Sequence, residues 1–252
     1  MKKTTNSLIP KKIHYFWFGN NPKPDIVLKC IESWKKHMPD YEIIEWNEQN
    51  YDINKIDYIK EAYKMKKWAF VSDYARFDIL EQYGGIYFDT DVELLKQIPH
   101  EILSSNKAIT SMESSGYVNP GLIFVSIPHH KFLNKILKIY EKEHFIIGDK
   151  INLKTINMYT TDLLKENGFV FEQKIQNICD IAIYPSSYFC GYDQDLREYD
   201  IKDETISVHH YAGTWKKKTF KSRMKMVTKK IFGKKIYKKI LNIKRRIFGI
   251  SR

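Results

Sequence analysis

The amino-acid sequence predicts an α/β fold built around a mostly parallel central sheet. Predicted strands and helices alternate along the chain, which is typical of parallel sheets covered by helices. The chain has 252 residues, of which 43% are hydrophobic and 14% aromatic, enough to form a sizeable core. This length fits one large domain or two small ones, and the composition excludes a fully disordered or fibrous chain.

The first elements of the chain are a strand, a helix and a second strand. The aromatic-rich stretch 12–18 predicts a buried strand. A helix is expected over 25–37, because apolar residues recur there at helical spacing, and Asp25 can cap its N-terminus. The segment 41–46 predicts the second strand.

The middle of the chain leads from two helices into an acidic turn. Helices are expected over 55–66 and 68–82, and Gly84 and Gly85 are expected to end the second one, because a helix C-terminus favours a residue with positive φ. A short strand over 86–88 then runs into an acidic segment. Further strands are expected over 107–112, 121–126, 169–172, 180–184 and 205–209, and further helices over 130–142 and 153–167.

The formal net charge of +12 resides entirely in the segment 216–252. This segment holds 16 Lys and Arg residues and no acidic residue, which leaves 26 basic and 30 acidic residues in 1–215. The body of the protein therefore has a net charge of −4, which argues against a nucleic-acid-binding module.

The basic segment 216–252 has the pattern of one or two amphipathic helices. Its apolar residues recur every three or four positions, and Lys and Arg occupy much of the rest. Such a C-terminal helical tail is expected to bind an anionic membrane surface. A solvated tail and a nucleic-acid contact are the alternatives. The apolar repeat consists of Phe220, Met224, Val227, Ile231, Ile236, Ile240, Ile243 and Ile247.

Cysteine usage and hydropathy indicate the compartment. The three scattered cysteines form neither a disulfide framework nor a zinc motif, which favours a reducing environment. No signal peptide is expected, and no run approaches the roughly 20 apolar residues of a membrane-spanning helix. We therefore expect a cytoplasmic protein, peripheral on the inner face of the cell membrane.

The strongest chemical motif is the pair Asp89 and Asp91, which follows an apolar strand. Residues two apart in an extended segment point to the same side, so the two carboxylates are expected to lie together. Ligands of open α/β sheets bind beyond the carboxyl ends of strands. Two carboxylates suit Mg²⁺ or Mn²⁺ with positions left for phosphate oxygens. The alternative is a solvated acidic turn.

Two further pairs place polar groups near this motif. Asp73 and Arg76 share one face of the predicted helix, where they form either a surface ion pair or a grip on sugar hydroxyls. His209 and His210 end another predicted strand, and one of two consecutive strand residues must face away from the core. A neutral imidazole is a suitable Mn²⁺ ligand.

Four blocks of sequence resemble glycosyltransferase family 32. In chain order they are IHYFWFGN, SDYARFDILEQYGGIYFDTD, IYPSSYFCGYD and HHYAGTW. The resemblance covers about residues 9–215 and extends to the glucosylating domains of clostridial toxins. It implies a GT-A type nucleotide-sugar-binding fold for a catalytic domain over 1–215, a nucleotide-sugar donor, Mn²⁺ or Mg²⁺, and retention of the anomeric configuration.

The resemblance also implies roles for individual residues. Asp89 and Asp91 match a metal–diphosphate pair, and His210, which begins H-x-x-G, matches a third metal ligand. Asp73 and Arg76 match residues that bind donor sugar hydroxyls and ribose. The other donor-binding positions are Trp17, which matches a base-stacking aromatic residue, Tyr87 in the nucleotide pocket, Asn119 near the transferred sugar and Trp215 at the β-phosphate.

The implied function is transfer of a hexosyl unit from UDP-hexose or GDP-hexose to a polyprenyl-linked sugar or glycan, in capsule or O-antigen biosynthesis. One alternative is a toxin-like enzyme that glycosylates a protein. Another is a phosphatase of haloacid-dehalogenase type, because FDTDV resembles its D-x-D-x-[TV] motif. That motif normally lies in the first strand of such a phosphatase, whereas here it begins at Asp89.

Overall fold

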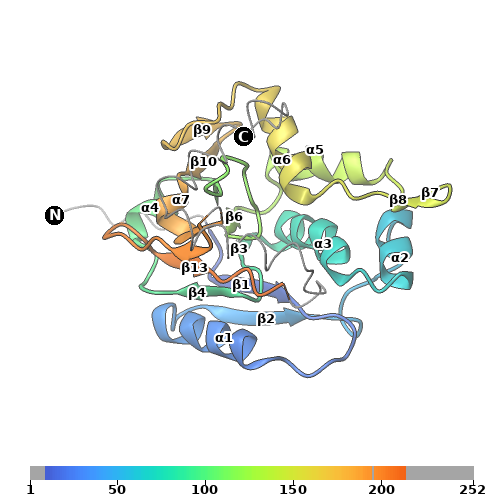
Figure 1. Cartoon of the computed structure of the whole chain (residues 1–252), viewed down its shortest axis with the longest axis horizontal. Coiled ribbons are helices and arrows are strands. Elements are labelled where there is room, and N and C mark those ends of the chain that lie inside the picture. The colour runs from blue at the N-terminus through green and yellow to red at the C-terminus, as the bar shows by residue number, and fades with distance from the viewer. Residues whose placement is uncertain (1–8, 195, 214–252) are drawn as a thin grey trace, which may run out of the picture.

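The central sheet has seven strands and is largely parallel. The computed structural model describes residues 9–194 and 196–213 (Figure 1). Five strands run in the same direction, and β6 and β9 run opposite to them, which confirms the predicted α/β class. The strands are, in spatial order, β2 (Glu42–Trp46), β1 (Lys12–Phe16), β3 (Gly85–Tyr87), β6 (Phe124–Ser126), β5 (Ala108–Ser111), β10 (Ile181–Tyr184) and β9 (Gln176–Ile178).

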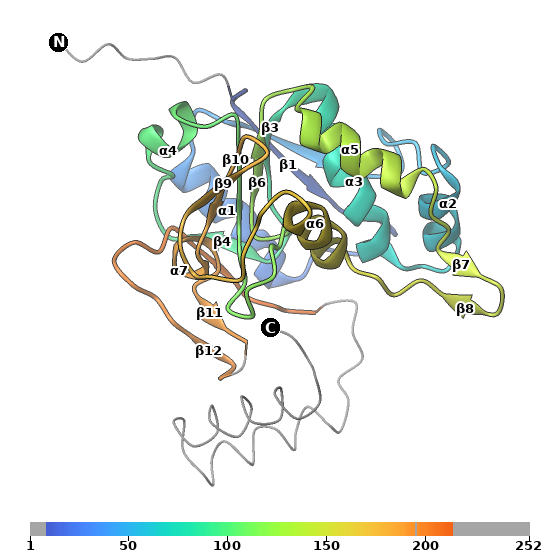
Figure 2. The same ribbon diagram turned by 90° about the horizontal axis from the view of Figure 1, so that it is seen from above.

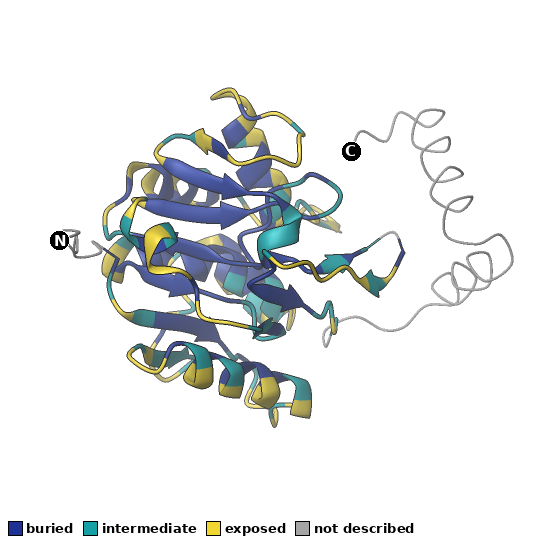
Figure 3. Ribbon diagram, turned by 90° about the vertical axis from the view of Figure 1, so that its left-hand side faces the viewer, coloured by how far each residue is buried: buried dark blue, intermediate teal, exposed yellow. Residues whose placement is uncertain are grey.

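Helices cover both faces of this sheet. Apolar residues of α2, α3, α5 and α6 form one core with one face, and residues of α1, α4 and α7 form a second core with the other (Figure 2). The inner strands of the sheet are buried, the edge strands β2 and β9 are partly exposed, and the outer helix faces are exposed (Figure 3). The helices are α1 (Asp25–His37), α2 (Asp57–Lys64), α3 (Trp68–Tyr83), α4 (His100–Ser104), α5 (Lys131–Tyr140), α6 (Ile156–Lys165) and α7 (Ser186–Phe189).

Three small two-stranded sheets complete the described chain. The strand β13 (Ser207–His209) pairs with β4 (Val92–Leu94) beside the acidic turn and not with the central sheet. This pairing brings the segment near residue 209 next to the segment near residue 91. The other two sheets are β7 (Ile146–Ile147) with β8 (Lys150–Ile151), and β11 (Tyr192–Asp193) with β12 (Glu198–Tyr199).

Two local predictions were wrong. Asp25 does not cap α1: Pro24 occupies the N-cap, and Asp25 is the first helical residue, where the helix dipole favours a carboxylate. The segment 169–172 is not a strand. The side chain of Gln176 accepts from the Val170 N–H and donates to the Val170 carbonyl, so these backbone groups have no strand partner.

The turn after α3 directs the chain into the site. Gly84 ends α3 with φ of +60°, as its position predicted, and a Cβ there would lie 2.8 Å from the carbonyl of Ser126. Buried His14 holds the same turn by donating from Nε2 to the Gly84 carbonyl over 2.9 Å. The chain then enters β3, and the acidic motif follows directly.

Two further expectations concern the C-terminal segment with Trp215 and the absence of a membrane-spanning helix. The predicted tail over 216–252 and Trp215 lie outside the described residues. In the described part of the chain, no helix combines the length and the apolar character required to cross a membrane.

Candidate metal and donor site

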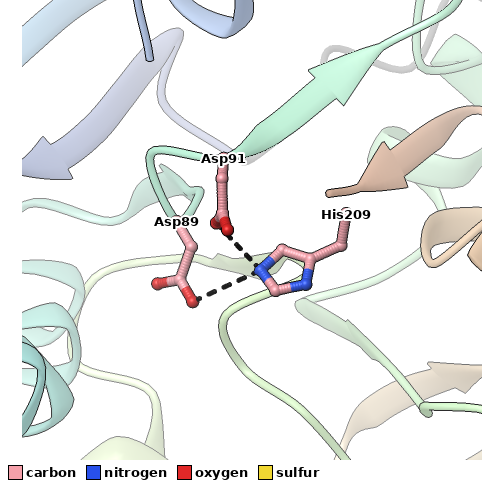
Figure 4. A group of neighbouring side chains, drawn as sticks. All are labelled: Asp89, Asp91 and His209. Carbon is pink, nitrogen blue, oxygen red and sulfur yellow. Dashed lines mark ion pairs between the residues drawn. The ribbon is translucent and has the colours of Figure 1, made fainter. Parts of the chain in front are cut away.

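Asp89, Asp91 and His209 form one compact group. One ligand atom from each lies within 4.8 Å of the others. Nε2 of His209 is 3.0 Å from Oδ1 of Asp91 and 3.9 Å from Oδ2 of Asp89 (Figure 4). The predicted approach of the two carboxylates therefore occurs, and an imidazole faces both of them.

Backbone contacts hold this group in place. Both aspartates lie in the turn between β3 and β4, and the Asp89 N–H donates to the Gly121 carbonyl over 3.0 Å. The chain beyond β13 turns around Asp91: the His210 N–H donates to its carbonyl and the Ala212 N–H to its Oδ2, each over 2.9 Å. The position of Asp91 thus depends on a segment far away in the sequence.

The histidine beside the aspartates is His209, whereas the sequence motif assigned the third ligand position to His210. Consecutive strand residues point to opposite sides, so only one of the two imidazoles reaches the carboxylates. His210 instead contacts Oε2 of Glu93 through Nε2 and the hydroxyl of Tyr199 through Nδ1, both at 2.8 Å. Its place is a neighbouring network that also includes Lys29.

The Asp–His group fits a divalent cation. His209 is buried with its Nε2 facing both carboxylates, and its Nδ1 has no hydrogen-bond partner among the described residues. Burial opposes ionisation of Asp91, but the facing imidazole outweighs burial and lowers the pKa of Asp91 to about 2. Two carboxylates and one imidazole form a donor set suited to Mn²⁺ or Mg²⁺.

Arg76 joins this group to the helix α3. Its guanidinium contacts Asp73 through Nη2 at 2.8 Å and Asp89 through Nη1 at 3.2 Å, and it lies 4.6 Å from the centre of the Tyr87 ring. The Tyr87 hydroxyl donates to Asp89 over 2.7 Å. The structure therefore brings together four residues that the sequence analysis singled out, and the pair 73 and 76 is not a surface ion pair.

Electrostatics explain why these charges are tolerated. Burial disfavours the guanidinium of Arg76, but Asp89, Tyr87 and Asp73 raise its pKa in total, so it stays charged. Burial raises the pKa of Asp73 to about 6, although Arg76 counteracts this shift. Burial also raises the pKa of Tyr87, which keeps its hydroxyl protonated as a donor to Asp89.

Asn119 lies in the loop whose Gly121 carbonyl accepts from the Asp89 N–H, and its side chain holds that loop. It accepts from the Gly121 N–H over 2.7 Å, and its amide donates to Oε1 of Glu113 over 2.7 Å. A Cβ added at Gly121 would lie only 2.1 Å from Oδ2 of Asp89. The sequence analysis missed Gly121 and Glu113. Gly121 follows Asn119 by two residues, in the stretch YVNPG, but no motif marks the glutamate.

Trp17 lies at the end of β1, where its indole N–H donates to the carbonyl of Asn21 over 2.7 Å. Its contacts are thus with the loop after β1 and with the core on the α1 side of the sheet. A cavity of about 520 Å³ lies beside this loop, lined by Gly19, Asn20, Asn21, Glu48, Tyr63, Lys66 and Trp68.

The chain thus has a mixed α/β fold in which an acidic pair follows a strand in the middle of the central sheet, as its sequence predicted. Residues 24–110 match the family described as "glycosyltransferase sugar-binding region containing DXD motif". This match agrees with the resemblance to DXD glycosyltransferases of family 32 type. It covers about a third of the chain and contains the second of the four sequence blocks, SDYARFDILEQYGGIYFDTD.

Individual relatives carry names of glycosyltransferases. The chain is 27% identical over 167 residues to inositol phosphoceramide mannosyltransferase 1 of Schizosaccharomyces pombe, covering 62% of this chain and 48% of that protein. It is 32% identical over 147 residues to alpha-1,4-N-acetylglucosaminyltransferase of Homo sapiens, covering 58% of this chain and 38% of that protein. The matched regions therefore span less than half of each relative.

A solved structure with a similar course of the chain is the PaToxG glycosyltransferase. It superposes with a TM-score of 0.46 at 20% identity over 63% of this chain and 69% of that chain.

Proposed function

We propose that this protein is a metal-dependent, retaining hexosyltransferase that uses UDP-hexose or GDP-hexose. The observation that supports the proposal best is the placement of Asp89, Asp91 and His209 beside the buried guanidinium of Arg76. A cation-binding group next to a permanent positive charge is suited to a diphosphate. The relatives named above make a nucleotide-sugar donor the natural source of that diphosphate.

The chemistry assigned to the chain is stabilisation of a leaving group. Mn²⁺ or Mg²⁺ held by Asp89, Asp91 and His209 would act as a Lewis acid toward diphosphate oxygens. Arg76 adds fixed positive charge where negative charge develops, which stabilises the transition state more than the ground state. Asp73, which pairs with Arg76, is proposed to accept hydrogen bonds from sugar hydroxyls. Trp215 is proposed to close over the donor and exclude water.

Retention is proposed to proceed by attack on the same face of the sugar that the diphosphate leaves. In this mechanism the leaving phosphate accepts the proton of the acceptor hydroxyl, so no protein nucleophile is required. The configuration of the product, determined by NMR, tests this step: a retained anomer agrees with it, and an inverted anomer contradicts it.

We further propose that 1–215 is the catalytic domain and 216–252 a membrane-associating tail. The charge of this segment and its apolar repeat support a peripheral position on the inner membrane face, near a polyprenyl-linked acceptor of capsule or O-antigen biosynthesis. Co-sedimentation with anionic vesicles should be lost in a chain that ends at Trp215. Equal sedimentation of both chains would contradict the membrane role.

The direct test of the activity is a panel of UDP-hexoses and GDP-hexoses with Mn²⁺. The proposal predicts release of nucleoside diphosphate from one donor class, with chelation of the metal abolishing release. Release of inorganic phosphate from phosphomonoesters, without turnover of any nucleotide-sugar, would instead identify the phosphatase alternative. Transfer to a protein acceptor only would identify the toxin-like alternative.

A further inference from the structure

A closed circuit of contacts passes through Asp89 and joins residues proposed to bind the donor to the N-terminus of α6. On one side, Arg76 joins Asp89 to Asp73, whose Oδ2 accepts from the Ile156 N–H at the start of α6 over 3.4 Å. On the other side, Asp89 leads through Gly121 to Asn119. The circuit closes because the amides of Asn119 and Asn157 both donate to Oε1 of Glu113.

Glu113 is the junction of this circuit. Its side chain is buried, and the two amides reach the same oxygen over 2.7 and 3.0 Å. The hydroxyl of Ser115 donates to the other oxygen over 3.1 Å. These three donors are neutral. A buried carboxylate is costly unless hydrogen bonds satisfy it, so its presence here indicates a specific role.

The two arms of Glu113 come from separate elements. Asn119 belongs to the loop under Asp89, and Asn157 lies in the first turn of α6, next to Ile156. The N-terminus of α6 is therefore tied to Asp73 by its backbone and to Glu113 by a side chain. Two contacts at different residues are needed to hold both the rotation of α6 and its distance from the loop that contains Asn119.

We propose that Glu113 is a positioning residue that holds Asn119 and the N-terminus of α6 at the proper distance from Asp89, so that the transferred sugar is correctly oriented. This inference rests on the proposed function and adds a residue to it. The diphosphate is proposed to be bound by Arg76 and by the metal that Asp91 and His209 help to hold, and Glu113 contacts none of these three residues in the contacts described above. Glu113 is thus expected to affect turnover of the donor much more than binding of the diphosphate.

The first test replaces the carboxylate. In the full chain, Glu113→Ala is expected to lower kcat for nucleotide-sugar hydrolysis by about 10- to 100-fold, the range expected when reacting groups are misplaced. The Kd for UDP or GDP with Mn²⁺ should change by less than about threefold, which is under 1 kcal/mol. Glu172→Ala is the matched control, because that carboxylate is exposed and pairs with Lys174.

The second test uses the contact itself and does not depend on the stability of one variant. Asn157→Asp places a carboxylate against Glu113 and should lower kcat by a similar factor. In Glu113→Gln/Asn157→Asp the repulsion is gone, and most of the activity should return. Absence of this rescue, or wild-type kcat in Glu113→Ala, would overturn the inference.

A third readout separates this inference from the proposed function. Amide hydrogen exchange at the start of α6 should become faster in Glu113→Ala than in Glu172→Ala. If the wild-type protein turns over no nucleotide-sugar, the proposed function fails, and exchange still decides whether Glu113 anchors α6. Equal exchange at the start of α6 in Glu113→Ala and Glu172→Ala would show that Glu113 does not anchor this helix and would overturn the inference.

Discussion

Nε2 of His209 lies 3.0 Å from Oδ1 of Asp91, although more than 100 residues separate the two in the sequence. The antiparallel pairing of β13 with β4 produces this approach, because it places His209 opposite Val92, the residue after Asp91. The pairing of β13 with β4, which lies outside the central sheet, thus positions His209 as the third donor of the candidate metal group.

Arg76→Lys should lower kcat/KM for the donor by about 100-fold, near 3 kcal/mol. A lysine carries the charge but cannot contact both Asp73 and Asp89 from one planar group while stacking on the Tyr87 ring. Initial rates across donor concentrations measure the effect.

Tyr87→Phe provides the comparison for Arg76→Lys. It keeps the ring beneath the guanidinium and removes only the hydroxyl that donates to Asp89. The expected loss is about tenfold or less. A larger loss for Tyr87→Phe than for Arg76→Lys would mean that the arginine is not the main positive group of the site.

Gly121→Ala should destabilise the protein by about 1–3 kcal/mol and weaken Mn²⁺ binding. The added Cβ would lie 2.1 Å from Oδ2 of Asp89 and 2.9 Å from Oδ1 of Asn119, so the carboxylate must move. Urea unfolding and Mn²⁺ titration measure the two effects.

Gly148→Ala separates packing from backbone strain. Gly148 has φ of +57° but no neighbouring atom within 4 Å of an added Cβ. Gly148→Ala should lower the free energy of unfolding by about 1–2 kcal/mol because of backbone strain, and it should leave Mn²⁺ binding unchanged. Equal weakening of Mn²⁺ binding in both variants would contradict the proposed contact between residue 121 and Asp89.

The free energy of unfolding should fall as the pH drops below about 6.5, in part because of His14. Burial lowers the pKa of His14 to about 4 from its ordinary 6.5. Its Nδ1 accepts from the Trp46 indole and its Nε2 donates to the Gly84 carbonyl, which requires the neutral ring. The unfolded state therefore binds more protons between these two pH values, and stability is lost as the pH falls through this window.

At pH 5 the contribution of His14 should amount to a loss of about 2 kcal/mol relative to pH 7.5. Urea unfolding at both pH values measures this loss. His14→Gln should remove this part of the pH dependence, whereas His100→Gln, at an exposed position, should retain it. An identical pH dependence in wild type and His14→Gln would show that His14 titrates normally.

Local patterns predicted much of the fold and the chemical part of the site. Period and turn residues located α1, α3, β1 and β10 closely, and the spacing of Asp89 and Asp91 predicted that their carboxylates lie together. These features depend on residues close in sequence. The meeting of Arg76 with Asp89 follows from α3 ending directly at β3.

Features that depend on distant pairing were not predictable in the same way. The choice between His209 and His210 depends on the register of β13 against β4, which no local pattern specifies. Glu113 lies in no motif, and its role becomes visible only when α6 packs near it. The apolar segment 169–172 resembles a strand, but the side chain of Gln176 takes its backbone bonds.

Asp89, Asp91 and His209 are proposed to bind the metal that holds the donor diphosphate. Mn²⁺ binding by electron paramagnetic resonance, with UDP or GDP present, tests this proposal in four proteins: wild type, Asp91→Asn, His209→Gln and His210→Gln. We expect one bound Mn²⁺ in wild type and His210→Gln, and affinity lowered at least about tenfold in the other two. Full affinity in His209→Gln with loss in His210→Gln would contradict the account.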